Sequence, residues 1–187
     1  AIGYAVPGSV VAVGILIPFS WLDQRINGFM DEQFGMMVGL LFSGSAFILI
    51  YAYVVRFLAV SFNAIEASLG KVTPSMDAAA RTLGQTAGGT LRRVHTPIIR
   101  GSLLAAAILV FVDVMKELPA TIILRPFNFD TLAVRAHNLA ADERLAEAST
   151  ASLTIVAVGI IPVILLSLAI RGSRPGSGGV GGKDKDL

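Results

Sequence analysis

The chain has 187 residues, of which 54% are hydrophobic and 15% are charged, and its net charge at pH 7 is +2. Soluble globular domains usually carry about 25% charged residues, so the composition argues against a soluble domain. The chain contains no cysteine, which excludes disulfides and thiolate metal sites. The small net charge gives no indication of a nucleic-acid partner, and none is expected.

Three segments, 1–22, 35–55 and 148–170, contain no charged residue and no histidine. Each is long enough to cross ~30 Å of hydrocarbon as a helix, which takes ~20 residues. A fourth segment, 98–118, is also long enough, although Arg100 interrupts its start. We therefore predict an all-α membrane protein with four transmembrane helices. Their predicted bounds are about 4–22, 36–55, 98–118 and 149–170.

The second predicted span carries small residues at Gly35, Gly39 and Ser43. This spacing places them on one helical face, where they would allow close helix packing in the membrane. In a chain with 19 glycines, chance explains the spacing almost equally well.

Basic residues are concentrated in the loop between the second and third spans. This loop contains Arg56, Lys71, Arg81, Arg92, Arg93 and Arg100 against Glu66 and Asp77. The positive-inside rule places the loop in the cytoplasm, together with the N-terminus and the tail 171–187. The tail is rich in Gly and Ser, so we expect it to be disordered. The connection 119–147 then lies outside, with a short helix near 131–140.

Within the loop, the sequence predicts two short helices about a glycine. Thr73 is a suitable N-cap for a helix that begins at Pro74. An apolar stripe formed by Met76, Ala79, Ala80 and Leu83 follows the helical period. Gly84 suits the turn, and a second helix over about 86–95 is expected to end at Pro97. This shape fits a groove on a partner protein. The alternative is an amphipathic loop on lipid headgroups, with Arg92 and Arg93 against phosphates.

The segment 77–97 resembles the EAA loop of bacterial ABC-importer permeases, the part that docks on the ATP-hydrolysing subunit. Alignment on Gly84 places Ala79 and Ala80 on the two alanines of the motif and Pro97 on its terminal proline. The motif glutamate falls on Ala78, with Asp77 next to it. The resemblance implies a docking loop that includes Asp77, Ala78, Ala79, Ala80, Gly84 and Pro97.

A second resemblance, to the ferric-iron importer permeases, is carried by the segments 4–8, 109–121 and 124–133. It implies the transmembrane domain of a type I ABC importer in the bacterial inner membrane, of which this chain is the C-terminal part. The implied partners are two ATP-binding subunits, a periplasmic substrate-binding protein and a second permease half or subunit. Related permeases carry thiamine, polyamines or phosphonates, so these substrates are alternatives to ferric iron.

Charged residues end the third span, with Asp113, Lys116 and Glu117 on one helical face. Carboxylates at membrane depth indicate function, here a translocation path or its gate. The alternative is a structural ion pair, either Asp113–Lys116 or Lys116–Glu117. Neither these residues nor His95 and His137 form an expected metal site.

The sequence has no phosphate-binding loop of the G-x-x-x-x-G-K-[ST] type and no nucleophile elbow. We therefore expect no enzymatic activity and no cofactor, with ATP hydrolysis supplied by another chain. An intramembrane enzyme, a channel and a structural membrane protein remain the rival classes.

Overall fold

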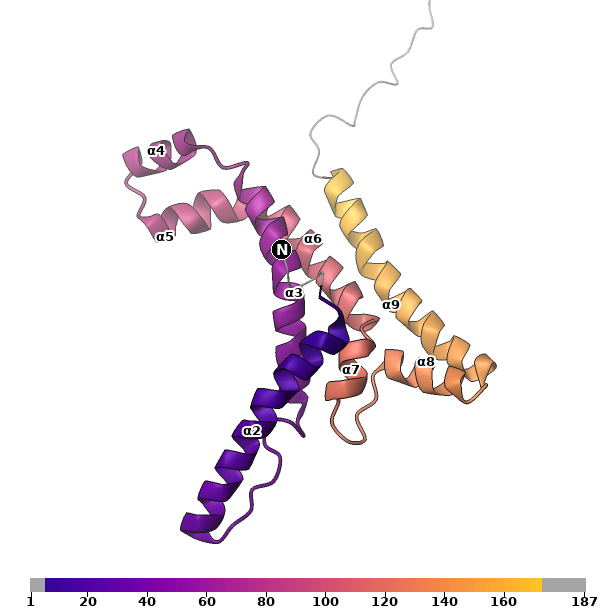
Figure 1. Ribbon diagram of the computed structural model, residues 1–187. Coiled ribbons are helices and arrows are strands. Elements are labelled where there is room, and N and C mark those ends of the chain that lie inside the picture. The colour runs from indigo at the N-terminus through magenta and orange to yellow at the C-terminus, as the bar shows by residue number, and fades with distance from the viewer. Residues whose placement is uncertain (1–5, 173–187) are drawn as a thin grey trace, which may run out of the picture.

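The computed structural model describes residues 6–172, which form helices with no strand among them (Figure 1). The long helices are α2 (Gly8–Phe34), α3 (Ala46–Leu69), α6 (Thr96–Met115) and α9 (Leu145–Gly172). The short ones are α4 (Pro74–Thr82), α5 (Ala87–Thr90), the π-helix η1 (Leu91–His95), α7 (Pro119–Leu124) and α8 (Leu132–Ala141). Four stretches of helix are long and apolar enough to cross a membrane. The predicted all-α membrane fold is thus confirmed.

The helices pack around a small core where α2, α3 and α7 meet. α3 packs along α6, whose other neighbour is α9, and α8 lies against α9. α4 and α5 project sideways from one end of α3 and α6, and α8 lies near the opposite end of the molecule (Figure 1). The core residues are Ala12, Ile15, Ile48, Leu49, Ala52, Ala120 and Leu124.

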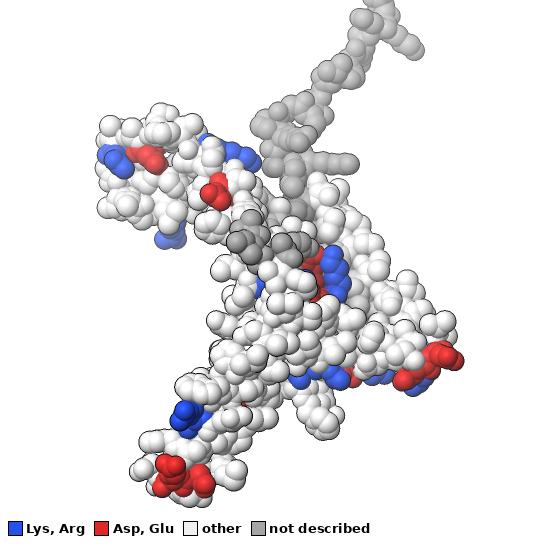
Figure 2. Space-filling model, in the orientation of Figure 1, with Lys and Arg blue, Asp and Glu red and all other residues white. Residues whose placement is uncertain are grey.

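Most of the apolar surface faces outward. In the four candidate spans, only 11 to 22% of the most apolar window is buried inside the chain. Figure 2 shows charged side chains at the ends of the molecule and at one place between them, with long uncharged surfaces elsewhere. Such surfaces are stable only against lipid or another subunit.

The first two long helices differ in bounds from the predicted spans. α2 continues to Phe34 because no proline follows Pro18 in it, and it ends at Gly35, whose φ of 63° is left-handed. A left-handed glycine is a common way to end a helix. The next helix begins at Ala46 rather than 36, and it extends past 55 to Leu69 because no glycine or proline interrupts it before Gly70.

Residues 35–45 do not form the start of the second span. They form a non-helical segment that runs back along α2 and binds to it. The carboxylate of Asp23, fully buried, accepts hydrogen bonds from the backbone N–H groups of Phe42 (3.0 Å) and Ser43 (2.8 Å), and from the Ser43 hydroxyl (2.5 Å). One turn further on, Asn27 exchanges two hydrogen bonds with the backbone of Gly39, at 2.7 and 2.9 Å.

The helix-packing interpretation of Gly35, Gly39 and Ser43 is therefore wrong. Gly35 and Gly39 have φ angles of 63° and 75°, so they permit turns, and Ser43 binds Asp23. Residues at helical spacing do not share one face where the backbone is not helical.

The third long helix also departs from its prediction at both ends. It ends at Met115 rather than at 118, and it begins earlier than predicted. Pro97 does not stop the preceding helix: a helix runs from Ala87 to Met115. A proline removes one backbone donor, and here the helix widens into η1 just before it, with the Thr96 hydroxyl donating to the Leu91 carbonyl at 2.8 Å.

The C-terminal part of the chain follows the sequence more closely. α8, at Leu132–Ala141, is the short helix expected near 131–140, and α9 begins at Leu145, four residues before the predicted 149. Of the predicted disordered tail, residues 173–187 lie outside the described range.

We expect Asp23→Ala to destabilise the protein by on the order of 3 kcal/mol, because it leaves two backbone N–H groups without their acceptor. Ser43→Ala removes only one hydroxyl and serves as the control, with a loss of about 1 kcal/mol. Thermal unfolding of the purified protein in detergent measures both. Equal melting temperatures for the two variants would contradict this role of Asp23.

Candidate functional site

A break in the third span brings the charged residues together. α6 ends at Met115, and α7 begins at Pro119, which has no N–H to donate to the Met115 carbonyl. Between them, Glu117 is 7% exposed. Its Oε1 accepts a hydrogen bond from the backbone N–H of Ala120 at 3.2 Å, so the carboxylate caps α7. A carboxylate is favourable there because helix N-termini carry partial positive charge.

Glu117 pairs with an arginine from another helix. Arg56 Nε, on α3, lies 3.2 Å from Glu117 Oε2, at an angle that makes the contact an ion pair rather than a hydrogen bond. Arg56 also donates from Nη1 to the Val6 carbonyl at 3.0 Å. At Gly8, a Cβ would lie 2.5 Å from Glu117 Oε1 and 2.9 Å from Arg56 Nη1. The pair thus links α3, the break and the start of α2, and a larger residue at position 8 would require the two charged side chains to shift.

Two hydroxyl groups lie next to this ion pair and add further polar contacts. Tyr53 Oη lies 2.5 Å from Thr121 Oγ1, and the Thr121 hydroxyl is 2.5 Å from the Glu117 carbonyl. Thr121 is fully buried. α3 therefore contacts the broken segment through two polar side chains, Tyr53 and Arg56, which lie three residues apart on one helical face.

The structure contains one of the two ion pairs that the sequence left open. Lys116 Nζ lies 2.9 Å from Asp113 Oδ1, with the Asp113 side chain 8% exposed and that of Lys116 63% exposed. Glu117 binds Arg56 instead of Lys116. The structure thus brings Asp113, Lys116 and Glu117 to the end of one helix, with Asp113 and Glu117 in separate ion pairs.

Arg56 was missed because the sequence analysis counted it with the basic residues of the loop. In the structure it is a residue of α3, with its side chain 15% exposed. The available signal was its position: uncharged segments, 35–55 and 57–65, lie on both sides of it. An isolated arginine between apolar runs indicates a buried partner of opposite charge.

The second part of the site is the helical lobe formed by residues 71–95, with α4, α5 and η1. α4 begins at Pro74 after Thr73, as predicted, but the Thr73 side chain does not cap it and contacts Ser75 instead. Gly84 forms the predicted turn, with a left-handed φ of 75°. The second helix begins after Thr86, whose hydroxyl accepts the N–H of Gly89 at 3.2 Å.

The predicted apolar stripe of the lobe is only partly buried. Ala80 is 4% exposed, whereas Met76 and Leu83 are 39% and 79% exposed. Ala78 and Ala79 are also exposed, and Pro97 lies at the second position of α6. The lobe therefore presents apolar side chains to its surroundings.

Polar contacts join the two halves of the lobe. His95 Nε2 lies 2.6 Å from Asp77 Oδ1, between η1 and α4. Arg93 donates to Gln85 Oε1 at 3.2 Å. Asp77 and His95 were each considered from the sequence, but no sequence signal pairs residues 18 positions apart.

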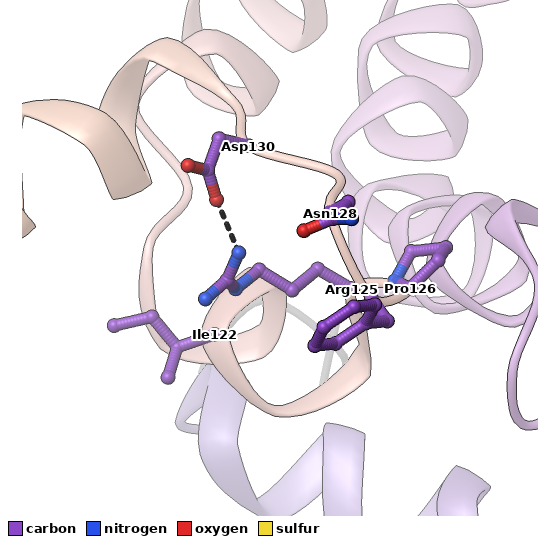
Figure 3. A pocket seen from close by; sticks show the side chains of 6 residues that line it. Ile122, Arg125, Pro126, Asn128 and Asp130 are labelled. Carbon is purple, nitrogen blue, oxygen red and sulfur yellow. Dashed lines mark hydrogen bonds and ion pairs between the residues drawn. The ribbon is translucent and has the colours of Figure 1, made fainter.

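Near the opposite end, the loop between α7 and α8 surrounds a cavity of about 530 Å³, shown in Figure 3. Arg125 and Asp130 form an ion pair across this loop, and Asn128 has a φ of 59°. Phe127 is 94% exposed. His137 is exposed on α8. Across residues 6–172, no three or more His, Asp or Glu side chains gather as they would around a metal ion.

We expect Arg56→Leu to cost about 3–5 kcal/mol, because it leaves the buried Glu117 carboxylate without its counter-charge. The double variant Arg56→Leu/Glu117→Leu should recover much of this loss, since an apolar pair carries no desolvation cost. The yield and melting temperature of folded protein in detergent measure the effect, with Lys71→Leu, at an exposed position in the lobe, as the control. A double variant less stable than Arg56→Leu would contradict the pairing.

No protein-family model matches the chain, but several curated proteins do. The Fe(3+)-transport system permease protein FbpB 2 of Haemophilus influenzae is 31% identical over 163 residues, which is 87% of this chain and 29% of that protein. The putative 2-aminoethylphosphonate transport system permease protein PhnV of Salmonella paratyphi A is 27% identical over 172 residues, 92% of this chain and 58% of that protein. The probable ABC transporter permease protein y4fN of Sinorhizobium fredii is 24% identical over 166 residues, 88% of this chain and 27% of that protein.

The chain thus spans between a quarter and three fifths of the length of these relatives, which fits the predicted correspondence to a part of such a subunit. The matches extend over nearly all of the described helices, including the broken segment and the lobe. Together with the four apolar helices, they place the chain among multi-pass proteins of the bacterial inner membrane, and its homologues are permeases of ATP-binding-cassette transporters.

Proposed function

We propose that this chain is part of the permease subunit of an ABC importer. The permease moves a substrate, delivered by a periplasmic binding protein, across the inner membrane, and a partner subunit supplies the energy by ATP hydrolysis. The observation that carries this proposal is the match of 87% of the chain to an iron-transport permease. That match includes a lobe that projects from the membrane-spanning helices (Figure 1).

In this proposal the lobe docks on one of two ATP-binding subunits. Leu83 and Met76 offer apolar surface to the partner, and Gly84 sets the angle between α4 and α5. The predicted docking residues Asp77, Ala78, Ala79, Ala80, Gly84 and Pro97 all lie in the lobe or at the start of α6. Without Arg56, which belongs to α3, the loop still has five basic residues against Glu66 and Asp77, so the charge bias supports a cytoplasmic lobe.

The charged face at the end of α6 is proposed to line the translocation path or its gate. Charges inside a membrane face protein or water rather than lipid. Asp113 and Lys116 form a pair in which the lysine is exposed, so this pair faces the path or the second permease half. Glu117 has a different role in this proposal: its ion pair with Arg56 holds the break between α6 and α7 in position.

Ferric iron is the proposed substrate, since one relative matching 87% of the chain is named for Fe(3+) transport. The second candidate is a phosphonate, because relatives matching 92% of the chain are named for 2-aminoethylphosphonate transport. The binding protein would approach from the end opposite the lobe. There the loop closed by the Arg125–Asp130 ion pair exposes Phe127.

Gly84→Ala should weaken the coupling between the permease and the ATP-binding subunit. Its φ of 75° is left-handed, and an alanine in that conformation costs about 1–2 kcal/mol. Gly88→Ala is the matched control, because Gly88 also has open space around it but lies in helical backbone. The measurement is ATP hydrolysis and uptake by the complete permease in proteoliposomes. The loaded binding protein is supplied either with ferric iron or with 2-aminoethylphosphonate.

The expected result is that Gly84→Ala assembles in normal amount but loses most stimulation by the loaded binding protein, whereas Gly88→Ala retains it. Full stimulation of Gly84→Ala would remove the docking role from the lobe. The ligand that supports uptake by the unchanged permease decides between iron and phosphonate.

The orientation of the chain in the membrane is tested separately by labelling single introduced cysteines. This is possible because the natural sequence contains no cysteine. Cysteines at Lys71 and Arg92 should react with an impermeant maleimide only after the cells are opened. A cysteine at Arg135, on α8, should react in cells with a permeabilised outer membrane. Labelling of position 71 or 92 from the periplasm would reverse the proposed topology.

A further inference from the structure

The two halves of the lobe share little buried surface. Between Lys71 and His95, only Ala80 and Thr90 are buried. The space between α4 and α5 contains a cavity of about 170 Å³. Its lining residues are Asp77, Arg81, Ala87, Thr90 and His95. Apolar packing therefore contributes little to the angle between the two helices.

A polar contact crosses this cavity. The His95 ring nitrogen Nε2 lies 2.6 Å from Asp77 Oδ1, although the two residues are 18 positions apart. The His95 side chain is 19% exposed and that of Asp77 is 37% exposed, so solvent screens the contact only in part. A charge-assisted hydrogen bond of this length belongs to the stronger class.

The remaining charged groups of the lobe do not replace this contact. Arg81 lines the same cavity from α4, the helix that also carries Asp77, so it cannot connect α4 to η1 through that carboxylate. Arg93 binds Gln85, next to the turn at Gly84. His95 is the last residue of η1, which continues directly into α6. The Asp77–His95 contact therefore attaches the outer helix to the membrane-spanning one.

We propose that Asp77 and His95 are a positioning pair that holds α4 at a fixed angle to η1 and α6. Asp77 acts through His95 and does not itself bind the ATP-binding subunit. The docking surface is then formed by the exposed apolar side chains of the lobe, chiefly Leu83 and Met76. This inference rests on the proposed function for its consequence in transport, but the geometry of the pair can be tested without any partner.

The first experiment uses the complete permease alone, in nanodiscs. Spin labels on cysteines at Ala78, in α4, and at Arg92, in η1, report the distance between the two halves by pulsed electron spin resonance. The unchanged lobe should give one narrow distribution. Asp77→Ala and His95→Ala should each broaden it and reduce the narrow population about fivefold, which corresponds to about 1 kcal/mol. The exchange Asp77→His/His95→Asp should restore it, and Glu66→Gln, an exposed carboxylate in α3, is the matched control.

The second experiment measures stimulated ATP hydrolysis by the assembled transporter. The two alanine variants should lose stimulation to the same extent, their combination should be no worse than either one, and the exchange should recover it. If Asp77→Ala abolishes stimulation while His95→Ala leaves it unchanged, Asp77 contacts the ATPase directly and the positioning role is overturned.

The two experiments separate the inference from the proposed function. Unchanged distance distributions in both alanine variants would overturn the positioning pair, whatever the ATPase does. Altered distances with unchanged ATP hydrolysis in every variant would support the pair and contradict docking by the lobe.

Discussion

The ion pair between Arg56 and Glu117 joins three elements beside the apolar core that α2, α3 and α7 share. In a membrane, apolar side chains gain nothing by leaving lipid for one another, so helix association depends on close packing and on polar contacts. α3 supplies the arginine, the break after α6 supplies the glutamate, and α2 begins at Gly8 against both. Neither charge can be removed alone without a large desolvation cost to the other.

The small residues of the core are a consequence of this arrangement. Where α2, α3 and α7 meet, Ala12, Ala52 and Ala120 are each at most 1% exposed. Alanines let the helix backbones approach closely, which is how membrane helices gain packing contacts. Within the break itself, Glu117 accepts a hydrogen bond from the N–H of Ala120, three residues further on, and its other oxygen lies against Arg56 of α3.

Features that depend on local sequence were predictable. Apolar segments of sufficient length, three of them uncharged, predicted four helices able to cross a membrane, since backbone polar groups in lipid must be satisfied within the helix. Pro74 marked the start of α4, and Gly84 marked the turn, because each has a local conformational preference that few other residues share. The resemblance to importer permeases was also local, and the homologues bear it out at the level of the family.

Features that depend on distant contacts were not predictable from one sequence. The ends of α2 and α3 lie well beyond their apolar segments, because helix propensity continues where hydropathy stops. The glycines at 35 and 39 were assigned to a helix, since only the contacts of Asp23 and Asn27 reveal the extended return. Arg56 is different, because the uncharged runs on both sides of it did indicate a helical position, although it was assigned to a loop.

The junction at η1 joins the second helix of the lobe to the third span in continuous helical backbone, Ala87 to Met115. The helix bends at this junction, because α5 projects sideways from the end of α6 (Figure 1), and a π-helical turn is a common site for a bend. α6 alone has 20 residues, or about 30 Å at 1.5 Å per residue, so a tilt of about 5° at its η1 end moves its other end by about 3 Å. Its far end carries Asp113 and adjoins the break at Glu117. Force applied at the lobe therefore reaches the charged end of α6 as a displacement comparable to the width of a water molecule or an ion.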